Sequence, residues 1–99
     1  MIDFAAIIII VASKFEKNYA GNHLAGQIIR SGTSPALNYG EAQSAESTKD
    51  FIYKMGICLK ELRESSVCLK IIEKSNLMSD VINLTIAKTE VNILISIFV

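Results

Sequence analysis

The segment Ser47–Asn76, STKDFIYKMGICLKELRESSVCLKIIEKSN, decides the fold of this 99-residue chain. One face of it recurs at alternating spacings of four and three residues, at Phe51, Met55, Cys58, Leu62, Ser65, Leu69 and Ile72. This spacing predicts an α-helix that packs along the seam of a left-handed helical bundle. Ser47, followed three residues later by the acidic Asp50, predicts the N-cap, and the helix is expected to end near Ser75–Asn76.

The preceding segment, from about Leu24 to Ala45, predicts a second helix of different composition. Its stripe carries small and polar residues where a bundle core needs large ones, at Leu24, Ile28, Ser31, Pro35, Asn38, Ala42 and Ala45. Gly32 and Pro35 predict a kink, because proline removes one backbone hydrogen bond and clashes with the preceding turn. A complete break into two shorter helices is the alternative.

The chain opens with the apolar run MIDFAAIIIIVA, which we assign to a first helix from about Ile2 to Tyr19. The isoleucines alone would also suit a buried strand, but Phe15 and Tyr19 continue a helical spacing and no partner strand is evident. Gly21 and Asn22 are then expected to end this helix and to begin the next one.

The last predicted helix begins at Ser79–Asp80 and runs to the C-terminus, with two apolar stripes. One comprises Val81, Leu84, Lys88, Val91, Ile95 and Phe98, and the other Ile82, Ile86, Ile93 and Ile97. Two apolar faces exceed what one core requires, so we expect one to pack inward and the other to contact a neighbouring subunit. Four helices joined by short turns predict an all-α, antiparallel up-and-down four-helix bundle, with residues 1–99 as a single domain.

Composition supports self-association and gives no sign of a free-standing nucleic-acid binder. Hydrophobic residues make up 51% of the chain and charged residues only 20%, and the excess apolar surface needs a partner. Ten basic and ten acidic residues cancel, whereas proteins that bind nucleic acid usually carry a marked positive excess. Homo-oligomerisation is therefore the first expectation.

Neither apolar end of the chain reaches the roughly 20 residues that a membrane-spanning helix needs, so no membrane association is expected. The N-terminus also lacks the basic residues of a signal peptide, which predicts a cytoplasmic protein. Cys58 and Cys68 lie about 15 Å apart along one predicted helix, beyond disulfide reach, and are expected to be small buried hydrophobes.

Residues suited to catalysis or metal binding are few. Glu41, Glu61 and Glu64 supply carboxylates, but His23 is the only histidine and lies outside any Glu-x-x-His pair. No serine–histidine–aspartate set and no phosphate-binding glycine loop can be assembled. We expect no enzyme, no metal and no cofactor, and a glutamate-based metal enzyme is the least favoured hypothesis.

Polar residues on the second and third predicted helices form the candidate structural or partner-contact cluster, namely Arg30, Asn38, Glu41, Lys54, Lys60, Glu61 and Glu64. If the two helices are antiparallel, residues of the first can pair with residues of the second. We favour a structural network over a ligand or RNA contact, because structural ion pairs are the commoner cause of such clusters.

A basic strip on the third helix is a second possibility, with tyrosines available for base stacking. It would comprise Lys49, Lys54, Lys60, Arg63 and Lys70, with Tyr39 and Tyr53. Acidic residues are interleaved with these cations along the helix, and a solvated helix face is the preferred interpretation.

The stretch QIIRSGTSPALNYGEAQSAESTKDFIYKMGICLKELRESSVCLKII resembles the core of the four-helix-bundle proteins encoded in intervening sequences of bacterial 23S ribosomal RNA genes. The resemblance covers about half of the chain directly. The positions that carry it are Arg30, Ser31, Ser34, Asn38, Glu41, Ala42, Ser47, Phe51, Lys54, Leu59, Lys60, Glu61 and Glu64.

The resemblance implies an up-and-down four-helix bundle, a ring-like homopentamer, a bacterial cytoplasmic origin and no known enzymatic activity. The family is similar in fold to the accessory proteins of diversity-generating retroelements, which bind nucleic acid and a reverse transcriptase. Those proteins are strongly basic, whereas this chain is neutral, and the departure weakens the case for direct RNA binding. A scaffold and an RNA-associated factor, contacting RNA or a nucleic-acid-processing protein, both stay open as functions.

Overall fold

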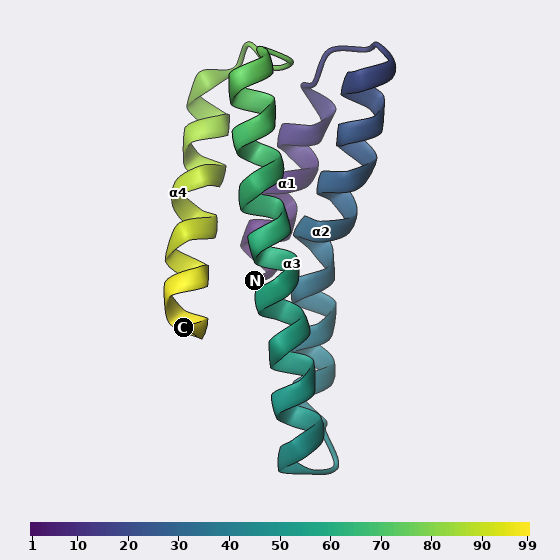
Figure 1. The fold of residues 1–99 in the computed structure, drawn as a ribbon, viewed down its shortest axis with the longest axis vertical. Coiled ribbons are helices and arrows are strands. Elements are labelled where there is room, and N and C mark those ends of the chain that lie inside the picture. The colour runs from purple at the N-terminus through teal and green to yellow at the C-terminus, as the bar shows by residue number, and fades with distance from the viewer.

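The computed structural model describes residues 1–99 as four helices, α1 (Ile2–Ser13), α2 (Tyr19–Gln43), α3 (Thr48–Ser75) and α4 (Val81–Phe98). Successive helices run in opposite directions, and contacts join α1 to α2, α2 to α3, α3 to α4 and α4 back to α1 (Figure 1). The predicted all-α four-helix bundle is confirmed.

Helix α3 begins and ends where its sequence predicts. The Ser47 hydroxyl oxygen accepts a hydrogen bond of 3.0 Å from the backbone N–H of Asp50. Asn76 ends the helix in the left-handed conformation, with φ of 56°, which asparagine tolerates better than most residues. The predicted inward face is confirmed at its centre, where Cys58, Leu62 and Leu69 are fully buried.

The junction between α1 and α2 lies earlier than predicted. Helix α1 ends at Ser13 and not at Tyr19, and Asn18 caps α2 by accepting a 2.8 Å hydrogen bond from the N–H of Gly21. Gly21 therefore belongs to the first turn of α2 and does not end α1. A Cβ atom at Gly21 would lie 1.8 Å from the backbone oxygen of Glu16, so the close approach of the loop requires glycine there.

Small residues on α2 let α1 pack closely against it. A Cβ atom at Gly32 would lie 2.6 Å from Cγ2 of the fully buried Ile8, closer than packed side chains allow. Helix α2 contributes only Ile28 to the main cluster of large buried side chains. The helix is continuous through Pro35, so the predicted alternative of a complete break is wrong, and the kink stays a prediction.

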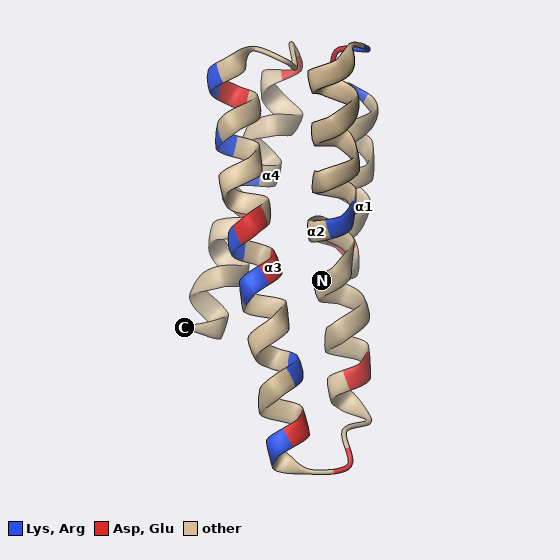
Figure 2. Ribbon diagram, turned by 45° about the vertical axis from the view of Figure 1, so that its right-hand side comes forward, with Lys and Arg blue, Asp and Glu red and all other residues tan.

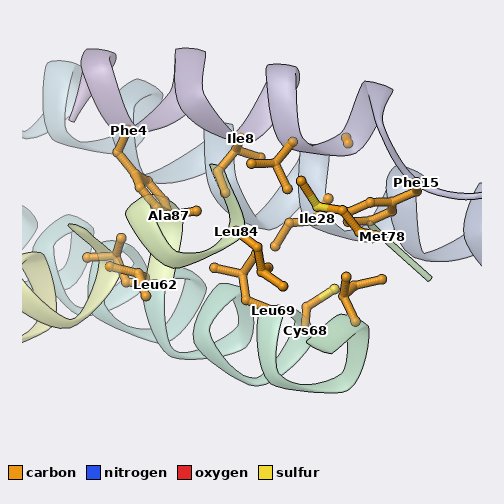
Figure 3. Close-up of a cluster of buried hydrophobic side chains, with 14 of the residues drawn as sticks. Phe4, Ile8, Phe15, Ile28, Leu62, Cys68, Leu69, Met78, Leu84 and Ala87 are labelled. Carbon is orange, nitrogen blue, oxygen red and sulfur yellow. The ribbon is translucent and has the colours of Figure 1, made fainter. Parts of the chain in front are cut away.

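The core lies where all four helices meet (Figure 3), in the part of the molecule that α1 and α4 cover (Figure 1). Fifteen buried side chains form it, and most come from α1, α3 and α4: Phe4, Ile8, Val11, Ala12, Phe15, Ile28, Leu62, Cys68, Leu69, Ile72, Met78, Leu84, Ala87, Val91 and Leu94. Both cysteines are buried and free, as predicted. Helices α2 and α3 extend as a pair beyond α1 and α4 (Figure 1), and the molecule measures 44 × 23 × 18 Å.

The inward stripe of α4 matches neither of the two predicted stripes in full. Its buried residues are Leu84, Ala87, Val91 and Leu94, whereas Val81 is exposed and Lys88 turns toward α3. Of the two predicted stripes, the one formed by four isoleucines is the exposed one. We call this exposed stripe, Ile82, Ile86, Ile93 and Ile97, the outer ridge of α4.

Two walls of the bundle can now be distinguished. Helices α1 and α4, which contact each other, form the α1/α4 wall, and helices α2 and α3 form the α2/α3 wall. Charged residues concentrate on α3, with few on α1 and α4 (Figure 2).

Candidate functional site

Arg30 of α2 joins two glutamates of α3. Its Nη1 donates to Oε2 of Glu61 at 2.9 Å and its Nη2 donates to Oε2 of Glu64 at 2.5 Å. The pKa of Arg30 is raised above its ordinary value. The hydrogen bond to Glu64 contributes most, followed by the negative charges of the two glutamates. The Glu61 side chain is only 11% exposed, whereas that of Arg30 is 53% exposed. A guanidinium that bridges two carboxylates is a geometry that lysine cannot reproduce.

A second, separate ion pair joins the same helices nearer their connecting turn. Lys54 Nζ donates to Oε2 of Glu41 at 2.8 Å, and this hydrogen bond raises the pKa of Lys54. Arg30 pairs with Glu64 and Glu41 pairs with Lys54. The residue number falls on one helix as it rises on the other, as it must for antiparallel helices. The predicted cluster is thus two ion-pair groups.

Two members of the predicted cluster take no part in pairing between helices. The Asn38 side-chain amide donates to the backbone oxygen and to the hydroxyl of Ser34, at 3.0 and 2.9 Å, within its own helix. Lys60 has no carboxylate within 4.0 Å, although it lies on the same turn of α3 as Glu61.

One buried polar contact between α2 and α3 is a serine pair that the predicted cluster did not include. The hydroxyl oxygens of Ser31 and Ser65 lie 3.0 Å apart, and that of Ser65 also lies 3.1 Å from the backbone oxygen of Glu61. Both serines are fully or almost fully buried. Their positions on the two inward stripes were the available signal, because a buried hydroxyl needs a partner. Nearby, the Cys58 thiol lies 3.5 Å from the backbone oxygen of Pro35.

A long open groove of about 690 Å³ runs between α2 and α3, and we call it the α2/α3 groove. Its lining mixes apolar side chains with cations, at His23, Leu24, Gln27, Ser31, Gly56, Leu59, Lys60, Arg63, Glu64, Val67, Cys68 and Ile71. Arg63, like Lys60, has no carboxylate within 4.0 Å, whereas Glu64 is paired with Arg30. The groove therefore offers an apolar floor with two unpaired cations at its middle.

The proposed basic strip is only partly assembled. Lys54 is paired with Glu41, while Lys49, Lys60, Arg63 and Lys70 form no ion pair. Tyr39 and Tyr53 do not line the groove. Tyr39 lies instead beside Phe51 and Ile97, at the C-terminal end of α4. The tyrosines and the unpaired cations of the groove thus do not form one surface.

The groups suited to acid–base, nucleophilic or metal chemistry are dispersed. No group of three or more histidine, cysteine, aspartate or glutamate side chains is positioned to hold a metal ion. His23 stacks on Tyr19, with ring centroids 6.3 Å apart. Burial raises the pKa of both Cys58 and Cys68, which keeps the thiols protonated at neutral pH.

The α1/α4 wall presents an apolar surface that the bundle itself does not cover. Ile82, Ile86, Ile93 and Ile97 are 76, 47, 50 and 70% exposed, and Ile9 and Ile10 of α1 are about half exposed. Helix α4 is long and apolar enough, by length and composition alone, to cross a membrane. In this fold its inward residues instead pack into the core between α1 and α3.

Comparison with known proteins agrees with this fold. The family model of the 23S rRNA-intervening sequence protein matches residues 1–95. A protein of unknown function from the S23 ribosomal protein family of Bacteroides thetaiotaomicron, with a crystal structure at 1.70 Å resolution, is 26% identical with a TM-score of 0.87. That likeness covers 98% of this chain and 89% of the other. No curated protein matches the chain.

Proposed function

The chain belongs to the 23S rRNA-intervening sequence protein family, and we propose that it is a non-catalytic protein that assembles with copies of itself. The α1/α4 wall supplies the contacts between subunits. The ion pairs of the α2/α3 wall set the register within each subunit. The molecule acts as a scaffold in the bacterial cytoplasm.

One observation carries the proposal, namely the exposed isoleucines of the α1/α4 wall. Only three charged residues lie on its two helices: Asp3, Lys88 and Glu90. Burying one isoleucine side chain is favourable by roughly 1.5–3 kcal/mol. Several aligned isoleucines with so few charges among them would leave a monomer poorly soluble, and mark a protein–protein contact.

The Arg30 group supports a structural role for the polar cluster. All of its hydrogen bonds are made within the chain, to Gln27, Glu61 and Glu64, so its charge is already satisfied without a ligand. An antiparallel pair held at two ion-pair groups and one buried serine pair resists sliding of α3 along α2. Ion pairs of this kind fix register at little gain in stability.

A closed homopentamer is the assembly that we propose, on the strength of the family resemblance. RNA association is the second candidate function, and the unpaired cations of α3 are the observation that favours it. In a ring, weak contacts from each subunit would be multiplied. The neutral net charge of the chain weighs against it.

The test is size-exclusion chromatography with light scattering, recording absorbance at 260 and 280 nm across the same peak. We expect a nucleic-acid-free oligomer whose mass does not change on adding detergent. A monomer at all concentrations would refute the proposal. An oligomer that carries RNA and loses it at high salt would instead establish the second candidate. Aggregates that dissolve only in detergent would assign the α1/α4 wall to a membrane.

A further inference from the structure

We infer that the α2/α3 groove of one copy receives the outer ridge of α4 from a second copy. This inference rests on the proposed self-association and specifies its geometry. The groove and the ridge lie on different walls of the subunit, so every copy offers one of each. Contacts of this head-to-tail kind generate rings when the rotation closes.

The groove and the ridge have matching lengths. Along α3 the groove lining extends from Gly56 to Ile71, which is about 22 Å at a rise of about 1.5 Å per residue. The outer ridge extends from Ile82 to Ile97, which spans the same number of residues. An apolar helix face seated in a groove between two helices is a common mode of recognition.

The charges of the two surfaces also match. In the groove, Lys60 and Arg63 lie between the apolar side chains of Leu59 and Val67. On the ridge, Glu90 lies one turn after Ile86 and just before Ile93, and it has no cation within 4.0 Å in its own chain. Seating the ridge in the groove brings a lone carboxylate to two lone cations, with apolar contacts on either side.

A symmetric contact between two α1/α4 walls would not give Glu90 a cation to pair with. The only cation on the two helices of that wall, Lys88, is already held by Glu73 at 2.7 Å. Glu90 would then be covered without a partner, which is costly. A nucleic acid fits the groove less well than a helix, because the groove floor is aliphatic and no tyrosine, phenylalanine or tryptophan lines it for base stacking.

Charge reversal tests the pairing. We expect Arg63→Glu and Glu90→Arg each to raise the dissociation constant of the assembly about tenfold or more, and the double variant to recover most of the loss. Lys49→Glu is the matched control, because Lys49 is an unpaired cation of α3 outside the groove. Light scattering over a dilution series gives the constants, and circular dichroism checks that each variant folds.

Disulfide trapping provides an independent readout. Subunits with Arg63→Cys are mixed with subunits carrying Glu90→Cys and oxidised. Cys68 lines the groove, so it is replaced by alanine in both variants. We expect a crosslinked dimer from the mixture and much less from either variant alone.

The outcomes separate this inference from the proposed function. If the wild-type protein is a monomer, both the proposed self-association and the groove contact are refuted. A wild-type oligomer that neither charge reversal weakens, and that gives no crosslink, would overturn the groove contact while self-association stands. Loss of co-purified RNA on Arg63→Glu, with unchanged oligomer mass, would likewise overturn it and assign the groove to nucleic acid.

Discussion

The two walls of this bundle handle charge in opposite ways. Helices α1 and α4 carry three charged residues, whereas α2 carries two and α3 carries ten. The α2/α3 wall joins its helices through ion pairs at the surface and a serine pair inside, while the α1/α4 wall packs through aliphatic side chains on its inner face and exposes more of them outside. The difference teaches that polar contacts within the subunit join the helices of one wall, whereas the other wall exposes an apolar face for which we propose a partner.

The walls also meet asymmetrically. Helix α1 packs onto α2 at Gly32, where Ile8 occupies the space that a side chain would need. The large side chains of the core therefore come from the α1/α4 wall and from α3, and α2 supplies a smooth surface. Such a joint tolerates little added volume.

Breaking the apolar wall should have the largest effect. Ile86→Asp combined with Ile93→Asp should raise the assembly dissociation constant about a hundredfold or more, because two buried isoleucines are lost and two charges are desolvated. Light scattering measures this, and helicity should be unchanged. Leu37→Asp, on an exposed part of α2 outside any groove, is the matched control and should leave the mass intact.

Adding volume where α1 packs against α2 should have the second-largest effect. Gly32→Ala should destabilise the fold by about 1–2 kcal/mol, because Ile8 must shift and this outweighs the gain in helix propensity. Gly40→Ala on the same helix has nothing within 4 Å of its added Cβ and should stabilise the fold by about 0.5–1 kcal/mol. Urea unfolding of the two variants, with opposite signs of change, measures the contrast. Equal effects would show that the joint is not tightly packed.

Removing the ion-pair bridge should have a smaller effect. Arg30→Ala should cost about 1 kcal/mol, since Glu61 is nearly buried and loses its partner while Arg30 is itself half exposed. Glu41→Ala, which breaks the more exposed pair with Lys54, should change the free energy of unfolding by much less than Arg30→Ala does. If both variants behave alike, the α2/α3 wall does not depend on Arg30.

Acid should weaken the fold slightly through contacts made by α3 and α4. The hydrogen bond from Lys88 lowers the pKa of Glu73, and those from Asn83 lower the pKa of Asp80. The folded state therefore binds fewer protons than the unfolded state, and this stability is present above the ordinary carboxylate pKa of about 4 and lost as the pH falls through and below it. Lys88→Met should lower the melting temperature more at pH 7 than at pH 3.5, and a constant difference would contradict the assignment.

Local signals in the sequence were sufficient for the helices themselves. The four-three spacing of α3, its cap at Ser47 and its end at Asn76 all follow from contacts between residues a few positions apart. The outer ridge of α4 was likewise predictable, because helical periodicity places Ile82, Ile86, Ile93 and Ile97 on one side.

The junction of α1 and α2 was predicted wrongly, because several neighbouring residues there are all suited to capping a helix. Asn18, Gly21 and Asn22 are all suited to helix ends. In the structure Asn18 is the cap, and Gly21 lies inside the first turn of α2 against the Glu16 backbone oxygen. The same limit applies to the inward stripe of α4, where Ala87 and Leu94 face the core because of where α1 and α3 lie.

The sequence by itself determined the presence of four helices, the caps of α3, the antiparallel order and the excess of apolar surface, because these depend on spacing along the chain and on composition. Only the tertiary structure decided that Arg30 bridges Glu61 and Glu64 while Asn38 binds its own helix. It also decided that Lys60 and Arg63 lie unpaired in a groove whose length matches the outer ridge of α4. Such pairings depend on the relative rotation and offset of packed helices, which no periodicity within a single helix specifies.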